Sequence, residues 1–267
     1  MNKPSQREII GVIPAAGRAT RLGPLPCSKE LFPVGFQSGD ADQSLHPKVV
    51  SQYLLEHFRR AGVRRTYIVI RKGKWDIPHY FGDGSALGMP IGYLIMNLPH
   101  GAPYTVDQAY PFVQDATIVF GFPDILVEPE DAFQRIVTHL DAAKADIVLG
   151  LFPTDQPNLC DPIEFDEGGG IRKIHVKPSD SDLRTTWTIA AWSPSFTEFL
   201  HEHLVGLERV AASRSGPRAE LFMSHIIMAA IDSGLRVEGL HLPQARFLDI
   251  GVPENLVQAM RTQLDSV

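Results

Sequence analysis

The chain has 267 residues, of which 44% are hydrophobic and 21% charged, and its formal net charge is −6, which disfavours a general nucleic-acid binder. No apolar run reaches the roughly 18 residues that a membrane span needs, so no membrane partner is expected. Cys27 and Cys160 lie far apart in the sequence and argue against a disulfide framework, so we expect a cytoplasmic protein. The length and composition suit one extended α/β domain.

The first predicted element is a short β-branched run at residues 9–13, typical of a buried parallel strand, which Pro14 ends. A loop of small residues around Gly17 follows, with basic residues that include Arg21 and Lys29. Small residues let backbone N–H groups approach an anion, and the cations add positive charge for phosphates. We interpret this segment as a cradle for a nucleoside triphosphate, although an ordinary glycine turn with solvated basic residues also fits the pattern.

The following segments predict alternating helices and strands. A polar stretch at residues 37–46 indicates a surface insertion, and residues 48–61 indicate a helix that ends before Gly62. Further strands are expected at residues 67–70, 91–96, 116–120, 145–151, 186–192 and 236–241. Further helices are expected at residues 128–140, 194–204, 220–233 and 253–264, and an antiparallel hairpin at 163–165 and 171–176. This order predicts right-handed crossovers and a mostly parallel sheet.

Two segments carry a specific resemblance to the sugar-1-phosphate nucleotidylyltransferases. Residues 16–22 (AGRATRL) and 28–34 (SKELFPV) resemble the family's G-G-x-G-T-R-L and P-K-x-L-x-P pattern, with Ala16 and Ala19 where the family has glycine. Residues 247–254 (FLDIGVPE) resemble its W-x-D-x-G-T-P-E. Serine before Lys29 looks like the thymidylyl branch, whereas residues 13–17 look like the bacterial uridylyl branch. The resemblance extends over about residues 9–258.

The resemblance implies a fold and a domain organisation. We expect an α/β fold with a Rossmann-like, mixed but mostly parallel sheet flanked by helices, of the GT-A-like nucleotidyltransferase type. Residues 1–267 would form a single domain, with residues 152–192 and the segment after them contributing a small antiparallel sugar-binding portion. No C-terminal β-helix domain is expected, because no hexapeptide repeat is present.

The resemblance also implies an activity and a set of site residues. A nucleoside monophosphate would pass from an NTP, with dTTP or UTP favoured, to a sugar-1-phosphate or related phosphate in an Mg²⁺-dependent reaction, and a homo-oligomer is compatible with it. Arg21 and Lys29 would be catalytic, and Asp124 and Asp249 would hold the metal. The expected nucleotide-binding residues are Ala15, Ala16, Gly17, Arg18, Ala19, Thr20, Arg21, Gly101 and Asp124. Tyr104, Thr105 and Asp107 are further candidate base contacts, with helix capping at Thr105 as an equal alternative.

The acceptor segment departs from the family pattern. The usual E-K-P reads Val176-Lys177-Pro178, and the usual Tyr-Gly contact before the hairpin is altered at Asp161. Lys177 can still pair with an acceptor phosphate, but the carboxylate missing at Val176 removes a hydrogen-bond acceptor for sugar hydroxyls. We therefore expect Asp161, Val176 and Lys177 at the substrate and an acceptor that differs from the common one.

Other interpretations remain open at this point. Asp124 could instead cap a turn or helix, and Asp249 could be a simple turn former. A non-catalytic, nucleotide-binding regulatory homologue is the main alternative function, favoured by the alanines at 16 and 19, by Val176 and by Phe247. An NAD(P)-binding oxidoreductase is remote, because its G-x-G-x-x-G fingerprint does not occur. The P-loop pattern of other nucleotide-binding proteins is absent from the sequence as well.

Overall fold

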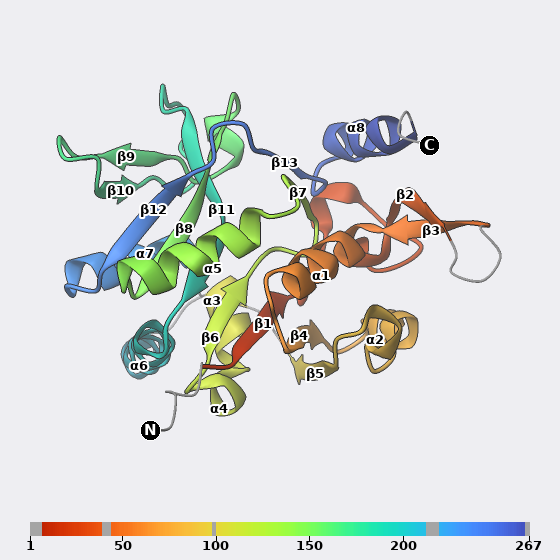
Figure 1. The fold of residues 1–267 in the computed structure, drawn as a ribbon, viewed down its shortest axis with the longest axis horizontal. Helices are drawn as coiled ribbons and strands as arrows, with labels where there is room; N and C mark the ends of the chain where they lie inside the picture. Colours follow the sequence, from red (N-terminus) through yellow and green to blue (C-terminus); the bar gives the residue numbers. More distant parts are fainter. Residues whose placement is uncertain (1–6, 39–43, 98–99, 212–218, 265–267) are drawn as a thin grey trace.

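The computed structural model describes residues 7–38, 44–97, 100–211 and 219–264, which form a seven-stranded sheet with helices on both faces (Figure 1). In spatial order its strands are β12 (Val237–His241), β8 (Ile147–Pro153), β11 (Thr185–Trp192), β6 (Thr117–Phe120), β1 (Ile9–Pro14), β4 (Arg65–Arg71) and β5 (Ile91–Met96). β11 runs antiparallel to both of its neighbours, and the other neighbouring pairs are parallel. The sheet is therefore mixed and mostly parallel, as the sequence predicts.

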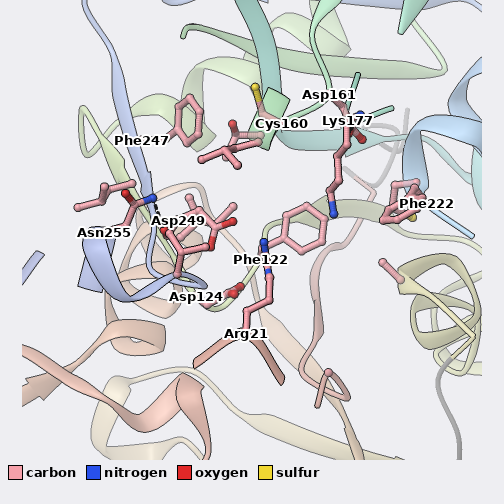
Figure 2. Close-up of a pocket in the computed structure, with 18 of the residues that line it drawn as sticks. Arg21, Phe122, Asp124, Cys160, Asp161, Lys177, Phe222, Phe247, Asp249 and Asn255 are labelled. Carbon is pink, nitrogen blue, oxygen red and sulfur yellow. Dashed lines mark hydrogen bonds between the residues drawn. The ribbon is translucent and has the colours of Figure 1, made fainter. Parts of the chain in front are cut away.

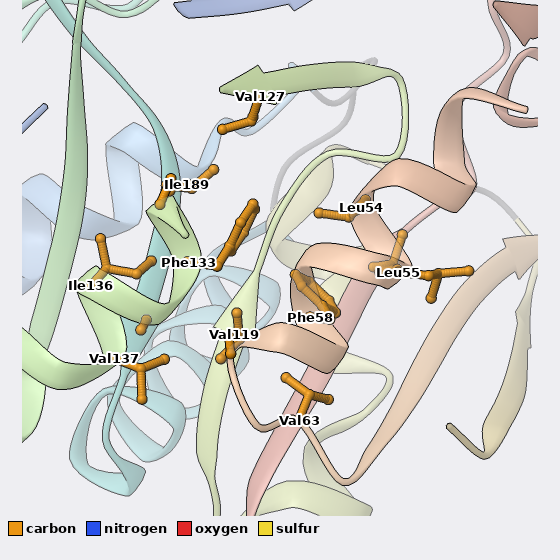
Figure 3. Packing of buried hydrophobic residues seen from close by; sticks show 14 of the residues in the cluster. Leu54, Leu55, Phe58, Val63, Val119, Val127, Phe133, Ile136, Val137 and Ile189 are labelled. Carbon is orange, nitrogen blue, oxygen red and sulfur yellow. The ribbon is translucent and has the colours of Figure 1, made fainter. Parts of the chain in front are cut away.

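Two sets of helices cover the sheet. The helices are α1 (Val50–Arg60), α2 (Asp76–Phe81), α3 (Ala102–Asp107), α4 (Tyr110–Val113), α5 (Ala132–Ala143), α6 (Pro194–Ala211), α7 (Met223–Asp232) and α8 (Pro253–Leu264). α1 and α5 pack together on one face, where the rings of Phe58 and Phe133 meet edge to face at 5.3 Å (Figure 3). α3, α4, α6 and α7 pack on the other, around Trp192 and Phe196. Each such buried ring contributes about 1.5–3 kcal/mol, which fixes the sheet that carries the site.

Smaller strand pairs surround the sheet. β9 (Ile163–Phe165) and β10 (Ile171–Ile174) form the predicted antiparallel hairpin. β2 (Pro33–Ser38) and β3 (Leu45–Val49) pair antiparallel and lie on the opposite side of the molecule from it, near α8 (Figure 1). β7 (Ile125–Glu128) pairs antiparallel with β13 (Arg246–Asp249). None of the helices in the described ranges is long and apolar enough to cross a bilayer.

Some predicted boundaries are wrong. Residues 37–46 are not simply an insertion, because β2 and β3 include both ends of that stretch; residues 39–43 lie outside the described residues. The helix expected from residue 48 begins at Val50, since residues 48 and 49 complete β3. The helix expected from residue 128 begins at Ala132, because Glu128 precedes a proline and is therefore biased toward the extended conformation of β7.

The direction of the chain connections reverses next to β1. The chain passes from β1 through α1 to β4 on one side, whereas β6 pairs with β1 on the other. In open α/β sheets, ligands bind beyond the carboxyl ends of the strands at such a switch point. The residues that follow β1 and β6 are therefore placed where a ligand is expected.

Candidate active site

A cavity of about 850 Å³ lies at this edge of the sheet, within the size range of small-molecule sites. We call its two parts the loop side, with Gly17, Arg21, Lys29, Asp124 and Asp249, and the hairpin side, with Cys160, Asp161, Lys177 and Phe222. In Figure 2, Arg21, Asp124 and Asp249 lie apart from Asp161, Lys177 and Phe222, and the Phe122 ring lies between the two groups.

Lys29 and Asp124 form the central ion pair of the loop side. Lys29 Nζ donates to Asp124 Oδ2 at 2.5 Å, and the two side chains are only 15% and 10% exposed. Burial alone would lower the pKa of Lys29, but Asp124, helped by Glu30 and Asp249, raises it. Burial alone would raise the pKa of Asp124, but the Lys29 ammonium holds it below its ordinary value. Both groups are therefore charged at neutral pH.

Asp249 is brought beside this pair by the β7–β13 contact. It lies opposite Ile125 in the register, and the Ile250 N–H donates to the Asp124 carbonyl at 3.0 Å. Burial and the neighbouring Asp124 carboxylate raise the pKa of Asp249. Asp249 Oδ1 also accepts the Gly251 N–H at 2.7 Å, so the turn-forming role considered from the sequence is real and coexists with a place in the cavity.

The two aspartates suit a magnesium ion whose remaining ligands are water and phosphate, rather than a metal held by protein ligands alone. Across the described ranges, no cluster of three or more His, Cys, Asp or Glu side chains is arranged to hold a metal. Mg²⁺ often takes only one or two carboxylates and completes its octahedron with waters and substrate phosphates. Because the raised pKa of Asp249 arises partly from repulsion by Asp124, a cation shared by the two carboxylates would relieve that repulsion.

Arg21 and the first loop complete the loop side. A Cβ added to Gly251 would lie 2.9 Å from Arg21 Nη2 and 2.8 Å from Asp249 Oδ1, so this glycine leaves room for both side chains. A Cβ added to Gly17 would lie 4.0 Å from Lys29 Nζ, which places the loop next to the lysine. The expected nucleotide-binding residues that line the cavity are Ala16, Gly17, Arg18, Thr20, Arg21, Gly101 and Asp124. Ala15 is buried behind them and donates its N–H to Val69 O at 2.8 Å.

Ala19 adopts a left-handed backbone, with φ 54° and ψ 34°. This is the position at which the resemblance expects glycine, and the loop keeps the glycine-like conformation rather than shifting to avoid it. A Cβ in this region costs about 1 kcal/mol relative to glycine. The departure at Ala19 is therefore accommodated as local strain.

Gly101 lines the cavity, but its own fold already requires glycine. Its φ is 115°, and a Cβ there would lie 1.9 Å from the Leu221 carbonyl oxygen. Thr105 also lines the cavity, whereas Asp107 pairs with His201 Nδ1 at 3.0 Å. The capping role considered for Thr105 is wrong, since Gly101 precedes α3 and Thr105 lies inside it, donating its hydroxyl to Gly101 O.

On the hairpin side, Asp161 holds the backbone of Lys177. Lys177 has a left-handed φ of 40°, and its N–H donates to Asp161 Oδ1 at 3.2 Å. Asp161 Oδ2 accepts the Ser224 hydroxyl at 2.5 Å, and Trp187 Nε1 donates to Ser224 Oγ at 2.9 Å. Lys177 Nζ lies 4.5 Å from the centre of the Phe222 ring, a cation–π contact. Val176 is half-buried and lies outside the cavity lining, so its place differs from that expected.

Several lining residues were missed by the sequence analysis. Phe122, Trp187 and Phe222 supply aromatic surface, and Asn255 Nδ2 donates to the Asp249 carbonyl at 2.7 Å. Phe122 could have been found, because it stands two residues before Asp124 at the end of a predicted strand. Nothing in the local sequence distinguishes the others from core or helix-surface residues.

Comparisons with known proteins identify the family of the chain. A family model for nucleotidyl transferase matches residues 10–266. The low-salt glycan biosynthesis nucleotidyltransferase Agl11 of Haloferax volcanii is 22% identical over 259 residues, which cover 96% of this chain and 66% of that protein. A glucose-1-phosphate thymidylyltransferase of Streptomyces griseus is 25% identical over 256 residues, which cover 94% of this chain and 65% of that protein. The chain thus spans just under two thirds of the length of these curated relatives.

A solved structure has the same fold. It is a Bacillus anthracis protein described as a glucose-1-phosphate thymidylyltransferase, in complex with sucrose. It matches with a TM-score of 0.79 over 96% of each chain. At 17% sequence identity, the likeness concerns the fold alone.

Proposed function

This chain belongs to the nucleotidyl transferase family, and we propose that it transfers a nucleoside monophosphate from an NTP to a sugar-1-phosphate or a related phosphate, releasing pyrophosphate. The observation that carries the proposal is the gathering of Arg21, Lys29, Asp124 and Asp249 on one side of a cavity that has Lys177 on the other. A site with cations on both sides suits two phosphorylated substrates that must meet.

The proposed reaction needs positioning and charge neutralisation more than covalent chemistry. An oxygen of the acceptor phosphate attacks the α-phosphorus of the NTP. A new P–O bond forms while the bond to the oxygen bridging to the β-phosphate breaks, and that oxygen leaves with pyrophosphate. Lys29 would stabilise the charge on the α-phosphate, Arg21 would bind the β- and γ-phosphates, and Lys177 would hold the acceptor phosphate.

Asp124 and Asp249 would hold Mg²⁺, which supplies positive charge to the phosphate oxygens. Asn255 and Gly251 would orient Asp249, since they bond to its carbonyl and its Oδ1. Lys29 would partly neutralise the negative charge of the Asp124 and Asp249 carboxylates, because it already contacts Asp124.

We propose dTTP or UTP as the nucleotide. The Streptomyces relative is named as a thymidylyltransferase and the serine before Lys29 favours the same branch, whereas residues 13–17 keep UTP in consideration. The altered hairpin side favours an acceptor other than the common one, because Asp161 is committed to Lys177 and Ser224 rather than fully free for sugar hydroxyls.

The test is a panel of NTPs against sugar-1-phosphates and other phosphomonoesters, read as pyrophosphate release with and without Mg²⁺. The proposal predicts release that depends on an acceptor and on the metal. A non-catalytic regulatory homologue would bind an NTP, for instance by calorimetry, and release no pyrophosphate with any acceptor.

A further inference from the structure

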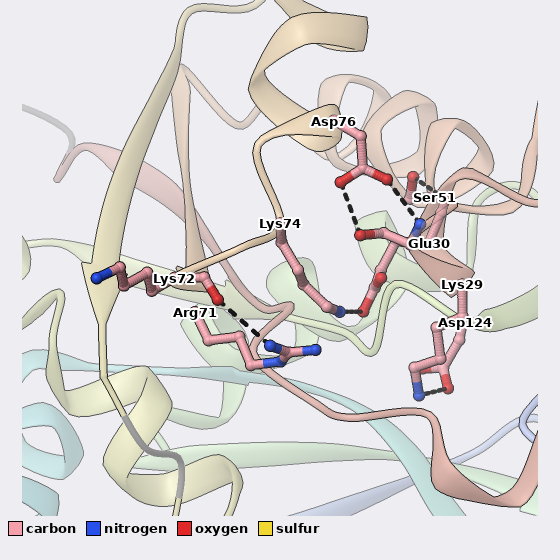
Figure 4. Close-up of polar contacts among 9 residues, drawn as sticks. Lys29, Glu30, Ser51, Arg71, Lys72, Lys74, Asp76 and Asp124 are labelled. Carbon is pink, nitrogen blue, oxygen red and sulfur yellow. Dashed lines mark hydrogen bonds and ion pairs between the residues drawn. The ribbon is translucent and has the colours of Figure 1, made fainter. Parts of the chain in front are cut away.

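Lys29 lies in a short 3₁₀ turn, Lys29–Leu31, whose side chains point in different directions. Lys29 lines the cavity, whereas Glu30 is buried and points into the interior (Figure 4). The residues before and after Lys29 are therefore available to hold the turn from outside the cavity.

Ser28 is held on the side of α2. Its N–H donates to Asp76 Oδ2 at 2.6 Å and its hydroxyl donates to Asp76 Oδ1 at 2.8 Å. The two bonds to one carboxylate fix both the backbone and the side chain of the residue that precedes Lys29.

Glu30 is held by two further elements. Lys74 Nζ, from the segment between β4 and α2, donates to Glu30 Oε1 at 2.6 Å, and these side chains are only 5% and 2% exposed. The Ser51 hydroxyl, from α1, donates to the Glu30 carbonyl at 2.6 Å. Glu30, Ser51, Lys74 and Asp76 all lie outside the cavity lining, so they cannot act by touching a substrate there.

Stability alone is a poor explanation for this pair. Burial raises the pKa of Glu30 and lowers the pKa of Lys74, which reflects the desolvation that their attraction must offset. Within the described ranges, Glu30 Oε2 is buried without a hydrogen-bond partner. Apolar side chains of similar volume often stabilise a fold as well as a buried ion pair does, or better.

We propose that the Glu30–Lys74 ion pair is a positioning device for Lys29, which fixes the turn so that the Lys29 ammonium faces Asp124 and the reacting phosphate. The inference rests on the proposed nucleotidyl transfer for its kinetic consequence, though not for its geometry. Misplacement of a catalytic group by about 1 Å can lower a rate by about 100-fold, so a device remote from the substrate can still control kcat.

The test replaces the pair with side chains of similar length, in Glu30→Met/Lys74→Met. The matched control is Lys48→Met/Glu56→Met, a half-buried ion pair at 2.7 Å that lies outside the cavity lining. We expect kcat to fall by about 10- to 100-fold, with each substrate KM within about 3-fold of wild type and a native unfolding midpoint. The control variant keeps the wild-type kcat.

A double-mutant cycle separates positioning from general damage. If the pair acts through Lys29, the same replacement in a Lys29→Ala background lowers kcat by less than about 3-fold further. Losses that multiply in that background, or a pair variant with wild-type kcat, overturn the proposal. Should the double variant not fold, Ser51→Ala, which removes the bond to the Glu30 carbonyl, takes its place in the same cycle.

A crystal structure of the variant gives a readout that does not need activity. We expect the separation of Lys29 Nζ and Asp124 Oδ2 to open from 2.5 Å to beyond hydrogen-bonding distance, about 3.5 Å. An unchanged separation overturns the positioning role. If the wild-type protein releases no pyrophosphate with any substrate pair, the proposed function fails, and this separation alone then decides the inference.

Discussion

The two sides of the cavity hold their lysines in different ways. Lys29 is 15% exposed and contacts Asp124 at the end of a central strand of the sheet, in a turn fixed by contacts from α1 and α2. Lys177 is exposed and lies after the small β9–β10 hairpin, where Asp161 is the side chain that bonds to its backbone. A buried lysine in a fixed turn suits the part of a reaction that does not depend on the acceptor. A lysine beside a separate hairpin can be altered with less effect on the packing of the core.

The largest expected effect on the rate comes from the loop side of the cavity. Lys29→Ala should lower kcat by about 10²–10³, the usual consequence of removing one electrostatic donor to a transition state. The same change leaves the buried Asp124 carboxylate without its lysine partner, so thermal unfolding is measured beside the rate and a lower unfolding midpoint is expected. Steady-state pyrophosphate release measures the effect, with the exposed Lys72→Ala as the control lysine. Full activity in Lys29→Ala would mean that the lysine belongs only to the ion pair with Asp124.

The next effect concerns the metal. Asp249→Asn should raise the Mg²⁺ concentration for half-maximal rate by about 10- to 100-fold, since it removes a charged oxygen next to Asp124. A magnesium titration of the rate measures it, and Asp83→Asn, an exposed carboxylate that bonds to the Ser85 N–H, is the control. An Mg²⁺ requirement equal to that of wild type would contradict the shared site. So would a crystal structure with the Asp124 and Asp249 carboxylates more than roughly 8 Å apart, too far for one hydrated ion.

The hairpin side should show its effect in acceptor choice. We expect glucose-1-phosphate to be at least ~10-fold poorer in kcat/KM than the best phosphorylated acceptor, a difference of about 1.4 kcal/mol. The reason is that a buried sugar hydroxyl without a partner costs roughly 1–3 kcal/mol. A kcat/KM panel of sugar phosphates decides the matter, and glucose-1-phosphate as the best acceptor at ordinary efficiency would refute the expectation.

The smallest expected effect is on stability and pH. Burial opposes ionisation of Asp76, but the two bonds from Ser28 lower the pKa of this carboxyl below its ordinary value. A lowered folded-state pKa stabilises the protein above the ordinary carboxyl pKa, near 4, and the stabilisation is lost as the pH falls through the folded-state value. Asp76→Asn should therefore reduce the loss of unfolding free energy below about pH 4 by less than about 1 kcal/mol, because solvent screens the group, and the Tm should fall less steeply there. Thermal unfolding of both proteins from pH 7 to pH 2 measures it, and parallel curves would exclude the contribution.

Sequence periodicity was sufficient to predict the main sheet but not the smaller strand pairs β2–β3 and β7–β13. The main strands are short β-branched runs, which are typical of a sheet covered by helices on both faces. Asp124 could therefore be placed just beyond the carboxyl end of one of these strands. β2 and β3 were missed because the stretch at residues 37–46, which includes the end of one and the start of the other, is polar, and because the prolines at 33 and 47 argue against a central strand. β7 was missed because its partner β13 is distant in the sequence, and no local signal reveals such a pairing.

The candidate site was predictable only where a motif names the residue. Arg21, Lys29, Asp124 and Asp249 were expected from the resemblance, and the structure places them in one cavity. The pairing of Glu30 with Lys74, and that of Asp161 with Lys177, depends on side chains that meet only after folding. The expected place of Val176 also depended on the path of the chain after β10, which periodicity does not specify.

The left-handed backbone of Ala19 would affect the thermodynamics of the proposed nucleotide binding. Glycine at this position would let the loop sample many backbone conformations, and a ligand would then have to select one of them. Alanine narrows that choice, so part of the ordering entropy is lost when the protein folds rather than when the nucleotide arrives. We therefore expect Ala19→Gly to relax the strained backbone, while binding of the NTP shifts toward a less favourable entropy in calorimetry. If the loop binds the nucleotide as proposed, this single methyl group lowers the stability of the fold and reduces the entropy that the loop loses on binding.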